Sequence, residues 1–413
     1  MLKNAYLGLF VVFVLLSSVY VLPPGMPQPA DLLVAMLIVV LATTFVIPVP
    51  VNKDLFLVAG LLLADAIIVN LYWYGQLQET GFLRHAIYYV FNLGAFLVVV
   101  SLVRSLGDRF VTAFRIAIGI AILLEIVALF VLPPTAFRTA GTFNNPNQLG
   151  YWGVLLSCCL LVLKRGQKLT VFDFAVLCGA GYLTMASLSK AAMLAFVLLL
   201  ITAIAFQHLT RPMKLVLAAL ALLGSAVAIA DSTQFDHVLS ARVFANVSQR
   251  VSDIGGQGDD SLAGRGYDRI WRHPEYLILG AGEGAHWRFS AFQINARQTD
   301  IEMHSTLGTM LFAYGIVGLT LFLSLLALVF WRAPLAHALY SLPIWIYGIT
   351  HQGLRDTMLW VFLGLVFGLA HYGRSSAEQG ARQPARDAAL FAGSRSAPRP
   401  PLGIHAPERA PRG

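Results

Sequence analysis

The chain of 413 residues is 57% hydrophobic and only 12% charged, which excludes an ordinary soluble globular protein and indicates a polytopic membrane protein. Its net charge of +8 does not indicate a nucleic-acid partner, because about half of the excess lies after Tyr372, where seven arginines accompany three acidic residues. The three cysteines all lie in apolar runs, and their odd number offers no disulfide framework.

Apolar runs of spanning length recur along the chain. A helical crossing needs about 20 residues, and backbone amides in lipid must be satisfied within the segment, so we predict an all-α fold. Residues 1–22 have the profile of a signal peptide but lack small-residue cleavage chemistry before Pro23, and we interpret them as an uncleaved first transmembrane helix. About twelve transmembrane helices are predicted, near residues 5–22, 30–48, 54–72, 85–103, 114–132, 147–163, 169–187, 190–206, 213–230, 305–331, 335–350 and 357–373.

Basic residues in the short loops predict the orientation of these helices. With the N-terminus in the cytoplasm, most loop lysines and arginines lie inside, as the positive-inside rule requires. The outer short loops then receive only Arg84, Arg138, Lys190 and Arg355. Both termini are predicted in the cytoplasm, and the polar segments share the outer face, namely residues 138–147, 187–190, 231–304 and 351–356.

Residues 1–373 are predicted to form the transmembrane domain, including one large outer loop at 231–304 between helices nine and ten. Short helices lying on the membrane are predicted in this loop, one of them with Tyr267, Ile270 and Trp271 at helical spacing. Residues 374–413 are rich in Arg, Ala, Pro, Ser and Gly, which cannot bury a core, and are predicted to be a disordered cytoplasmic tail.

The stretch RTAGTFNNPNQLGY, at residues 138–151, interrupts two long apolar segments with polar groups. Asn145 or Asn147 would cap the following helix, with Pro146 in its first turn. Capping explains one asparagine but not three amides within five residues. We therefore predict that Asn145 and Asn147 also hydrogen-bond to a polar ligand or to the loop opposite, with ligand binding as the predicted role.

Four basic residues lie on the predicted outer face, where the positive-inside rule leads us to expect few of them: Arg138, Lys190, Arg265 and Arg355. Each sits at or beside a helix end, so anchoring at the interface by snorkelling is one interpretation. The other is a site for an anionic group such as a diphosphate, because arginine presents a rigid fork to phosphate oxygens and clustered cations stabilise a departing diphosphate.

Two histidines lie near these cations. His304 is at the outer mouth of the tenth helix, where an imidazole with an ordinary pKa near 6.5 suits a general base for a sugar hydroxyl. A local capping or hydrogen-bonding role is the alternative, and His351 is a weaker candidate. The sequence GAGEG at 280–284 lacks the strand-to-helix context of a phosphate loop, and the aspartates match no standard metal spacing, so neither cofactor nor metal is predicted.

Four motifs follow one another along the chain: GTFNNPNQLGY, SLSKAAMLAF, AGRGYDRIW with LGAGEGAH, and EMHSTLGTMLFAYGIVGLTLF. In this order they resemble the bacterial O-antigen ligases and the related Wzy-type O-antigen and exopolysaccharide polymerases. The first is similar to that family's Gly-Thr-Phe-x-Asn-Pro-Asn signature, and the last to its histidine segment leading into Gly-hydrophobic-hydrophobic-Gly. Lys190 stands where arginine is usual, and Ser305 stands where asparagine is common.

The resemblance implies a GT-C-like membrane glycosyltransferase with His304 and Arg265 as catalytic residues and Lys190 among the substrate-binding residues. The implied reaction is metal-independent, inverting transfer of a glycan from undecaprenyl diphosphate to an acceptor hydroxyl, at the periplasmic face of the bacterial inner membrane. The acceptor is a glycan in a polymerase, which we slightly favour, or a lipid A core sugar in a ligase. Chain-length regulators and other polysaccharide-assembly proteins are implied partners.

A transporter or flippase of lipid-linked sugars is the alternative function. Such a protein places charged residues at mid-membrane depth. The candidates here gather at the outer helix ends, with Asp65 and Glu125 as the main exceptions.

Overall fold

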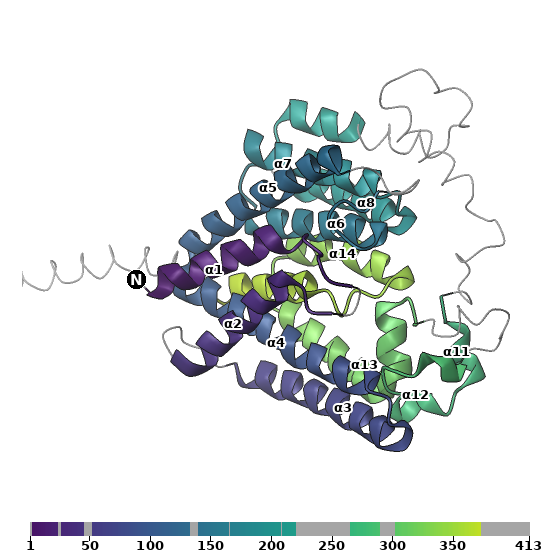
Figure 1. Ribbon diagram of the computed structural model, residues 1–413. Coiled ribbons are helices and arrows are strands. Elements are labelled where there is room, and N and C mark those ends of the chain that lie inside the picture. The colour runs from purple at the N-terminus through teal and green to yellow at the C-terminus, as the bar shows by residue number, and fades with distance from the viewer. Residues whose placement is uncertain are drawn as a thin grey trace, which may run out of the picture.

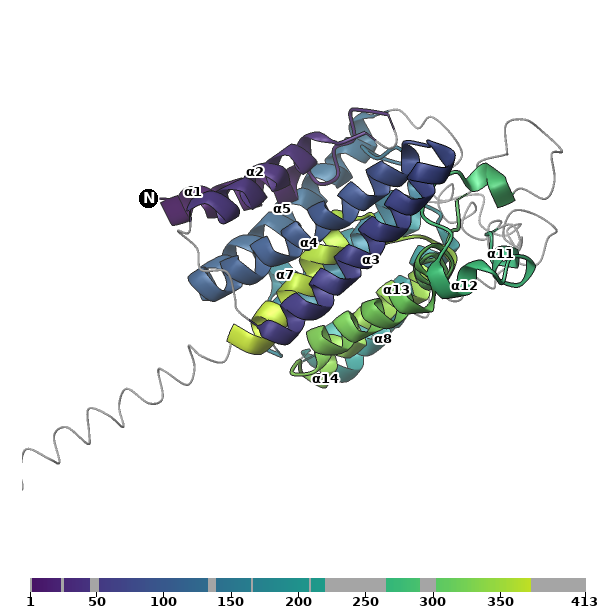
Figure 2. The ribbon, with the colours of Figure 1, turned by 90° about the horizontal axis from the view of Figure 1, so that it is seen from below.

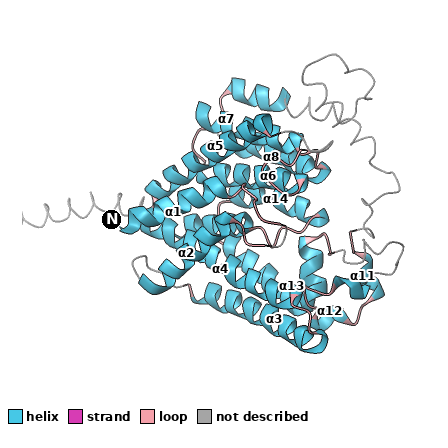
Figure 3. Ribbon diagram, in the orientation of Figure 1, coloured by secondary structure: helices cyan, strands magenta, loops and turns pink. Residues whose placement is uncertain are grey.

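The computed structural model describes residues 2–23, 26–44, 52–132, 139–164, 166–207, 209–219, 265–289 and 302–372. Every regular element within these ranges is a helix, so the predicted all-α class is confirmed (Figures 1 and 3). The longer helices are α1 (Leu2–Leu16), α2 (Pro29–Thr44), α3 (Lys53–Leu77), α4 (Gly81–Leu106), α5 (Asp108–Val131), α6 (Pro146–Leu163), α7 (Val171–Ala186), α8 (Lys190–Phe206), α13 (Thr306–Phe330), α14 (Leu335–Thr350) and the Thr357–Tyr372 helix.

Five of these helices are long and apolar enough to cross a membrane, namely α3, α4, α5, α6 and α13. Each predicted apolar run contains helix where the structure describes it, including residues 211–219 at the start of the ninth run. The count of about twelve crossings and their sidedness stay predictions. Most of the loop 231–304 and the whole tail 374–413 lie outside the described residues. The described part of the loop carries α11 (Asp268–Arg272), α12 (Tyr276–Leu279) and the 3₁₀ helix η2 (His286–Phe289).

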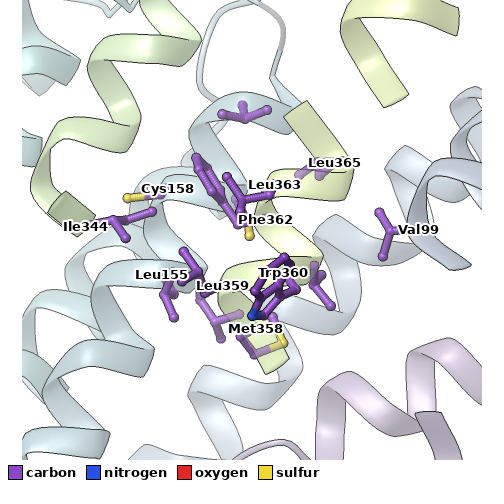
Figure 4. Close-up of a cluster of buried hydrophobic side chains, with 14 of the residues drawn as sticks. Val99, Leu155, Cys158, Ile344, Met358, Leu359, Trp360, Phe362, Leu363 and Leu365 are labelled. Carbon is purple, nitrogen blue, oxygen red and sulfur yellow. The ribbon is translucent and has the colours of Figure 1, made fainter. Parts of the chain in front are cut away.

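The core of the bundle is built around α6 and the Thr357–Tyr372 helix. Every residue of α6 from Leu149 to Leu163 is buried, because this helix is apolar around its whole circumference after the first turn. Figure 4 shows Leu155 and Cys158 of α6 close to Leu359 and Phe362 of the Thr357–Tyr372 helix. Other helices therefore surround both central helices. This packing holds the polar residues at the ends of the two helices in defined positions.

Polar contacts distinguish the two ends of the bundle. At one end, the buried carboxylate of Asp173 pairs with Lys164 at 2.9 Å and Arg115 at 3.4 Å, and Arg109 donates to the side chain of Asn4 at 3.0 Å. The short helices α11 and α12 lie at the opposite end, away from the N-terminus (Figure 2). We call these the basic end and the cap end.

Candidate functional site

The residues just before α13 bring two predicted site residues together. Ser305 caps α13, since its hydroxyl accepts from the backbone N–H of Gly308 at 3.0 Å. The backbone N–H of His304 donates to the carbonyl of Arg265 at 3.0 Å, and His304 is partly covered by protein and partly exposed. The Tyr267 hydroxyl lies 2.7 Å from the Ser305 hydroxyl and ties the two segments together again.

Arg265 in turn meets the loop after α14. Its Nη1 donates to the carbonyl of Thr350 at 2.5 Å and lies 3.4 Å from Nε2 of His351. The His351 ring stacks on Tyr347 with a centroid distance of 4.5 Å. His304, Arg265 and His351, which are far apart in the sequence, therefore lie in one cluster at the cap end.

The same stack reaches the start of α6. Tyr347 also stacks on Tyr151 at 4.3 Å, and its hydroxyl donates to the carbonyl of Asn147 at 3.0 Å. Asn145 is the cap of α6, because its side chain accepts from the N–H of Asn147 at 2.8 Å, as the pattern predicted. Asn147 thus joins the cluster through its backbone, while the Asn145 oxygen is engaged in capping. Arg138 lies outside the described residues.

The Gly-Thr-Phe part of the first motif is a structural anchor. The N–H of Thr142 donates to Glu125 Oε1 at 2.8 Å, and its hydroxyl lies 2.6 Å from Glu125 Oε2 and 2.6 Å from the Ser18 carbonyl. Gly141 has a φ of +59°, and a Cβ there would collide with the Glu125 carboxyl group. Glu125 is therefore used to hold this loop against α5.

Lys190 is the first residue of α8 and is half-buried. The hydroxyl of Tyr340, early in α14, donates to Gln207 just after α8, so the two helices run antiparallel. The start of α8 consequently lies at the same end as His351. The structure thus places Lys190 at the cap end.

Arg355 also lies at this end, but it is paired with two carboxylates. Its guanidinium contacts Glu283 Oε1 at 2.7 Å and Glu302 Oε2 at 2.7 Å. The Glu283 side chain is only 2% exposed, whereas that of Glu302 is 34% exposed. The predicted phosphate contact of Arg355 stays a prediction, and its observed contacts bind the loop after α14 to the segment before His304.

Glu283 is not among the predicted site residues, although it lies in the GAGEG stretch at 280–284. Its carboxylate also accepts from Gln352 at 2.7 Å, Tyr314 at 2.9 Å and Tyr89 at 3.2 Å. Its backbone N–H donates to Asn70 at 2.9 Å. Glu283 therefore connects α3, α4, α13 and the loop after α14. An acidic side chain in an otherwise apolar glycine-rich stretch was the signal available in the sequence.

The electrostatic surroundings favour a neutral His304. Desolvation by the surrounding protein, followed by the charge of Arg265, lowers its pKa below the ordinary value of 6.5; Arg269 and Arg355 act in the same direction, and Glu302 opposes them. Arg269, also missed in the sequence, is 4% exposed and lies over the ring of Phe289 at 5.5 Å. At neutral pH the imidazole is therefore mainly unprotonated and able to accept a proton.

Comparison of the chain with protein-family models and with curated protein sequences gives no match to either.

Proposed function

We propose that the protein is a membrane glycosyltransferase that moves a glycan from undecaprenyl diphosphate to an acceptor hydroxyl, in the assembly of a cell-surface polysaccharide. The observation that carries this proposal is the convergence of His304, Arg265 and His351 beside the first turn of α6, at one end of an apolar bundle. A base next to a fixed cation at a membrane surface suits a donor that is anchored in lipid through a diphosphate.

In the proposed reaction, neutral His304 accepts the proton of the acceptor hydroxyl as that oxygen attacks the anomeric carbon. The bond between this carbon and the diphosphate oxygen breaks, and its electron pair leaves with the diphosphate. Direct displacement inverts the anomeric centre. The lowered pKa of His304 supports this role, because the base is ready without prior deprotonation.

Arg265 is proposed to hold the diphosphate and to stabilise the charge that develops on the departing oxygen. Its hydrogen bond to the Thr350 carbonyl fixes the guanidinium beside His351, and the Arg265 backbone carbonyl accepts from the backbone N–H of His304. Lys190 and Arg138 are proposed as further contacts to the donor. Arg355 is proposed to act through its pairs with Glu283 and Glu302.

Proteoliposomes containing an undecaprenyl-diphosphate-linked glycan donor test the proposal. His304→Ala and Arg265→Ala should abolish transfer, while both variants elute from size exclusion as the unmodified protein does. His273→Ala is the matched control, because this histidine lies in the same segment and contacts the exposed Glu275 at 3.2 Å. Undiminished turnover in His304→Ala would eliminate it as the base.

The acceptor is proposed to be a growing glycan, with a lipid A core sugar as the other choice. In a deletion strain, single repeats that accumulate on the lipid carrier would indicate a polymerase. Long chains that are made but not attached to lipid A would indicate a ligase.

A transporter of lipid-linked sugars is the second candidate, and Asp65 is the observation that favours it. This half-buried residue of α3 has a buried carboxylate oxygen without a hydrogen bond to any described residue. Glu125 no longer favours transport, since it anchors Thr142. A transporter would move the intact donor across the liposome membrane in an Asp65-dependent manner, without cleaving the bond to diphosphate.

A further inference from the structure

Residues 276–285, which we call the wedge, comprise α12 and the glycine-rich turn that follows it. The backbone N–H groups of Ala281 and Gly282 donate to the carbonyls of Phe312 and Ala313 in α13, both at 2.9 Å. At about 1.5 Å per residue, these carbonyls lie roughly 10 Å from the start of α13. The break at Gly315 leaves Thr306–Tyr314 as the first segment of α13, and the contact lies in the last turn of this segment, about two turns from the helix start. For a segment that begins at the membrane surface, the contact lies within the bilayer.

The helix is adapted to receive the wedge. Gly315 interrupts α13 with a φ of +67° and a ψ of −171°. A Cβ at Gly315 would collide with the carbonyl of Ile278, and one at Gly280 would collide with the carbonyl of Ala313. Two backbones thus approach each other where each has a glycine with positive φ. Non-helical backbone at membrane depth is tolerated where protein satisfies its polar groups, and the hydrogen bonds from the wedge do so here.

Helix α3 receives the wedge from another side. The indole N–H of Trp73 donates to the Gly280 carbonyl at 3.0 Å, and the Asn70 side chain accepts from the N–H of Glu283 at 2.9 Å. Measured from the end of α3 at Leu77, these residues lie roughly 6 and 10 Å along the helix. Both helices therefore bind the wedge roughly one to two turns inside their ends, and Figures 1 and 2 show α12 beside α13.

No residue that the structure describes covers one face of the wedge. Ile278 and Leu279 are 66% and 74% exposed, while Leu277 packs on the small core around Phe312. The residues directly after the break in α13, Ile316 and Val317, are 51% and 46% exposed. Transfer of such apolar side chains from water into apolar surroundings is favourable, so an apolar neighbour is favoured.

We propose that the wedge is a re-entrant segment and that Ile278 and Leu279 contact the acyl chains of the bilayer. They would continue the lipid-facing surface of α13 that Ile316 and Val317 begin. The depth of the contacts and the continuity of the apolar surface both support bilayer lipid as the partner. The proposal needs only the membrane location of the chain and does not depend on the proposed transferase activity.

Cysteine variants carrying an environment-sensitive fluorophore test this surface. Leu279→Cys, Ile316→Cys and Arg272→Cys would each be made in a Cys178→Ala background, because Cys178 is the one native cysteine that is not fully buried. The probe at Ile316 is the positive control, because this residue lies on α13, a helix that is predicted to span the membrane. Arg272 on α11 is the control for a water-exposed position, since its polar side chain is 48% exposed. The labelled proteins are reconstituted in liposomes with and without lipids brominated on their acyl chains.

Probes at Leu279 and Ile316 should both lose emission as brominated lipid is added, while the probe at Arg272 should not. Leu279→Cys should also react more slowly with a membrane-impermeant maleimide than Arg272→Cys. Equal labelling of Leu279→Cys and Arg272→Cys, without quenching, would show that the wedge lies in water and would overturn the proposal. Quenching at Leu279 that disappears when a polyprenyl diphosphate is added would instead assign the surface to the donor's hydrocarbon tail and also overturn it.

Discussion

Replacement of Glu283 by glutamine is expected to destabilise the protein strongly. The carboxylate is 2% exposed and accepts from Arg355, Gln352 and two tyrosine hydroxyls, so the substitution removes a charge from a buried, fully bonded position. Breaking a buried ion pair by removing one partner costs about 3–5 kcal/mol. We expect about 3 kcal/mol here, because Glu302 continues to compensate the Arg355 guanidinium.

Glu302→Gln is the matched control, because Glu302 contacts the same guanidinium but is 34% exposed. Solvent screening limits such a pair to about 0–1 kcal/mol. The free energies of unfolding are compared by equilibrium titration of mixed micelles with a denaturing detergent. If the two variants lose equal stability, the idea that Glu283 is the buried centre of the cap end is wrong.

Three further outcomes are expected. Because the pKa of His304 is lowered and its neutral form is the proposed base, the transfer rate should decline as pH falls, with a midpoint below 6.5; a midpoint above 6.5 would contradict the assignment. Gly280→Ala should destabilise clearly more than Gly166→Ala. Gly280 combines φ +88° and ψ 152°, which only glycine adopts readily, with the close carbonyl of Ala313, whereas Gly166 has positive φ but open space and should cost only about 1–3 kcal/mol; equal losses in the same titration would refute the close backbone approach. Glu125→Ala should lower the free energy of unfolding by about 1–3 kcal/mol, because the backbone N–H and the hydroxyl of Thr142 lose their acceptor. An unchanged free energy of unfolding would show that other contacts hold this loop.

Much of the fold follows from local sequence. Apolar runs longer than a core helix needs, with basic residues between them, predict an all-α membrane protein. The capping signal at Asn145 and Pro146 marks the start of α6, and the apolar run 190–206 matches α8, which begins at Lys190. The prediction ended the third helix near residue 72, where the apolar run stops. The structure continues α3 to Leu77, because a helix can extend beyond its apolar part.

The candidate site was predicted only in part. Local motifs identified His304, Arg265 and Asn147, and the structure places them at one end. The ion pair between Arg355 and Glu283 could not be predicted from local sequence. The two residues are far apart in the chain, and they meet only because the wedge packs between the helices. Similarly, the bond from Glu283 to Asn70 spans 213 positions, and no periodicity or spacing within either segment indicates it.

The central claim is tested most directly by following the bond between the sugar and the diphosphate in a synthetic lipid-linked glycan, with purified protein in liposomes. The account predicts that free undecaprenyl diphosphate forms only when an acceptor glycan is present, with one inverted glycosidic bond per carrier released, and that His304→Ala does neither. Absence of release by the unmodified protein under these conditions, or equal release by His304→Ala, would contradict the account.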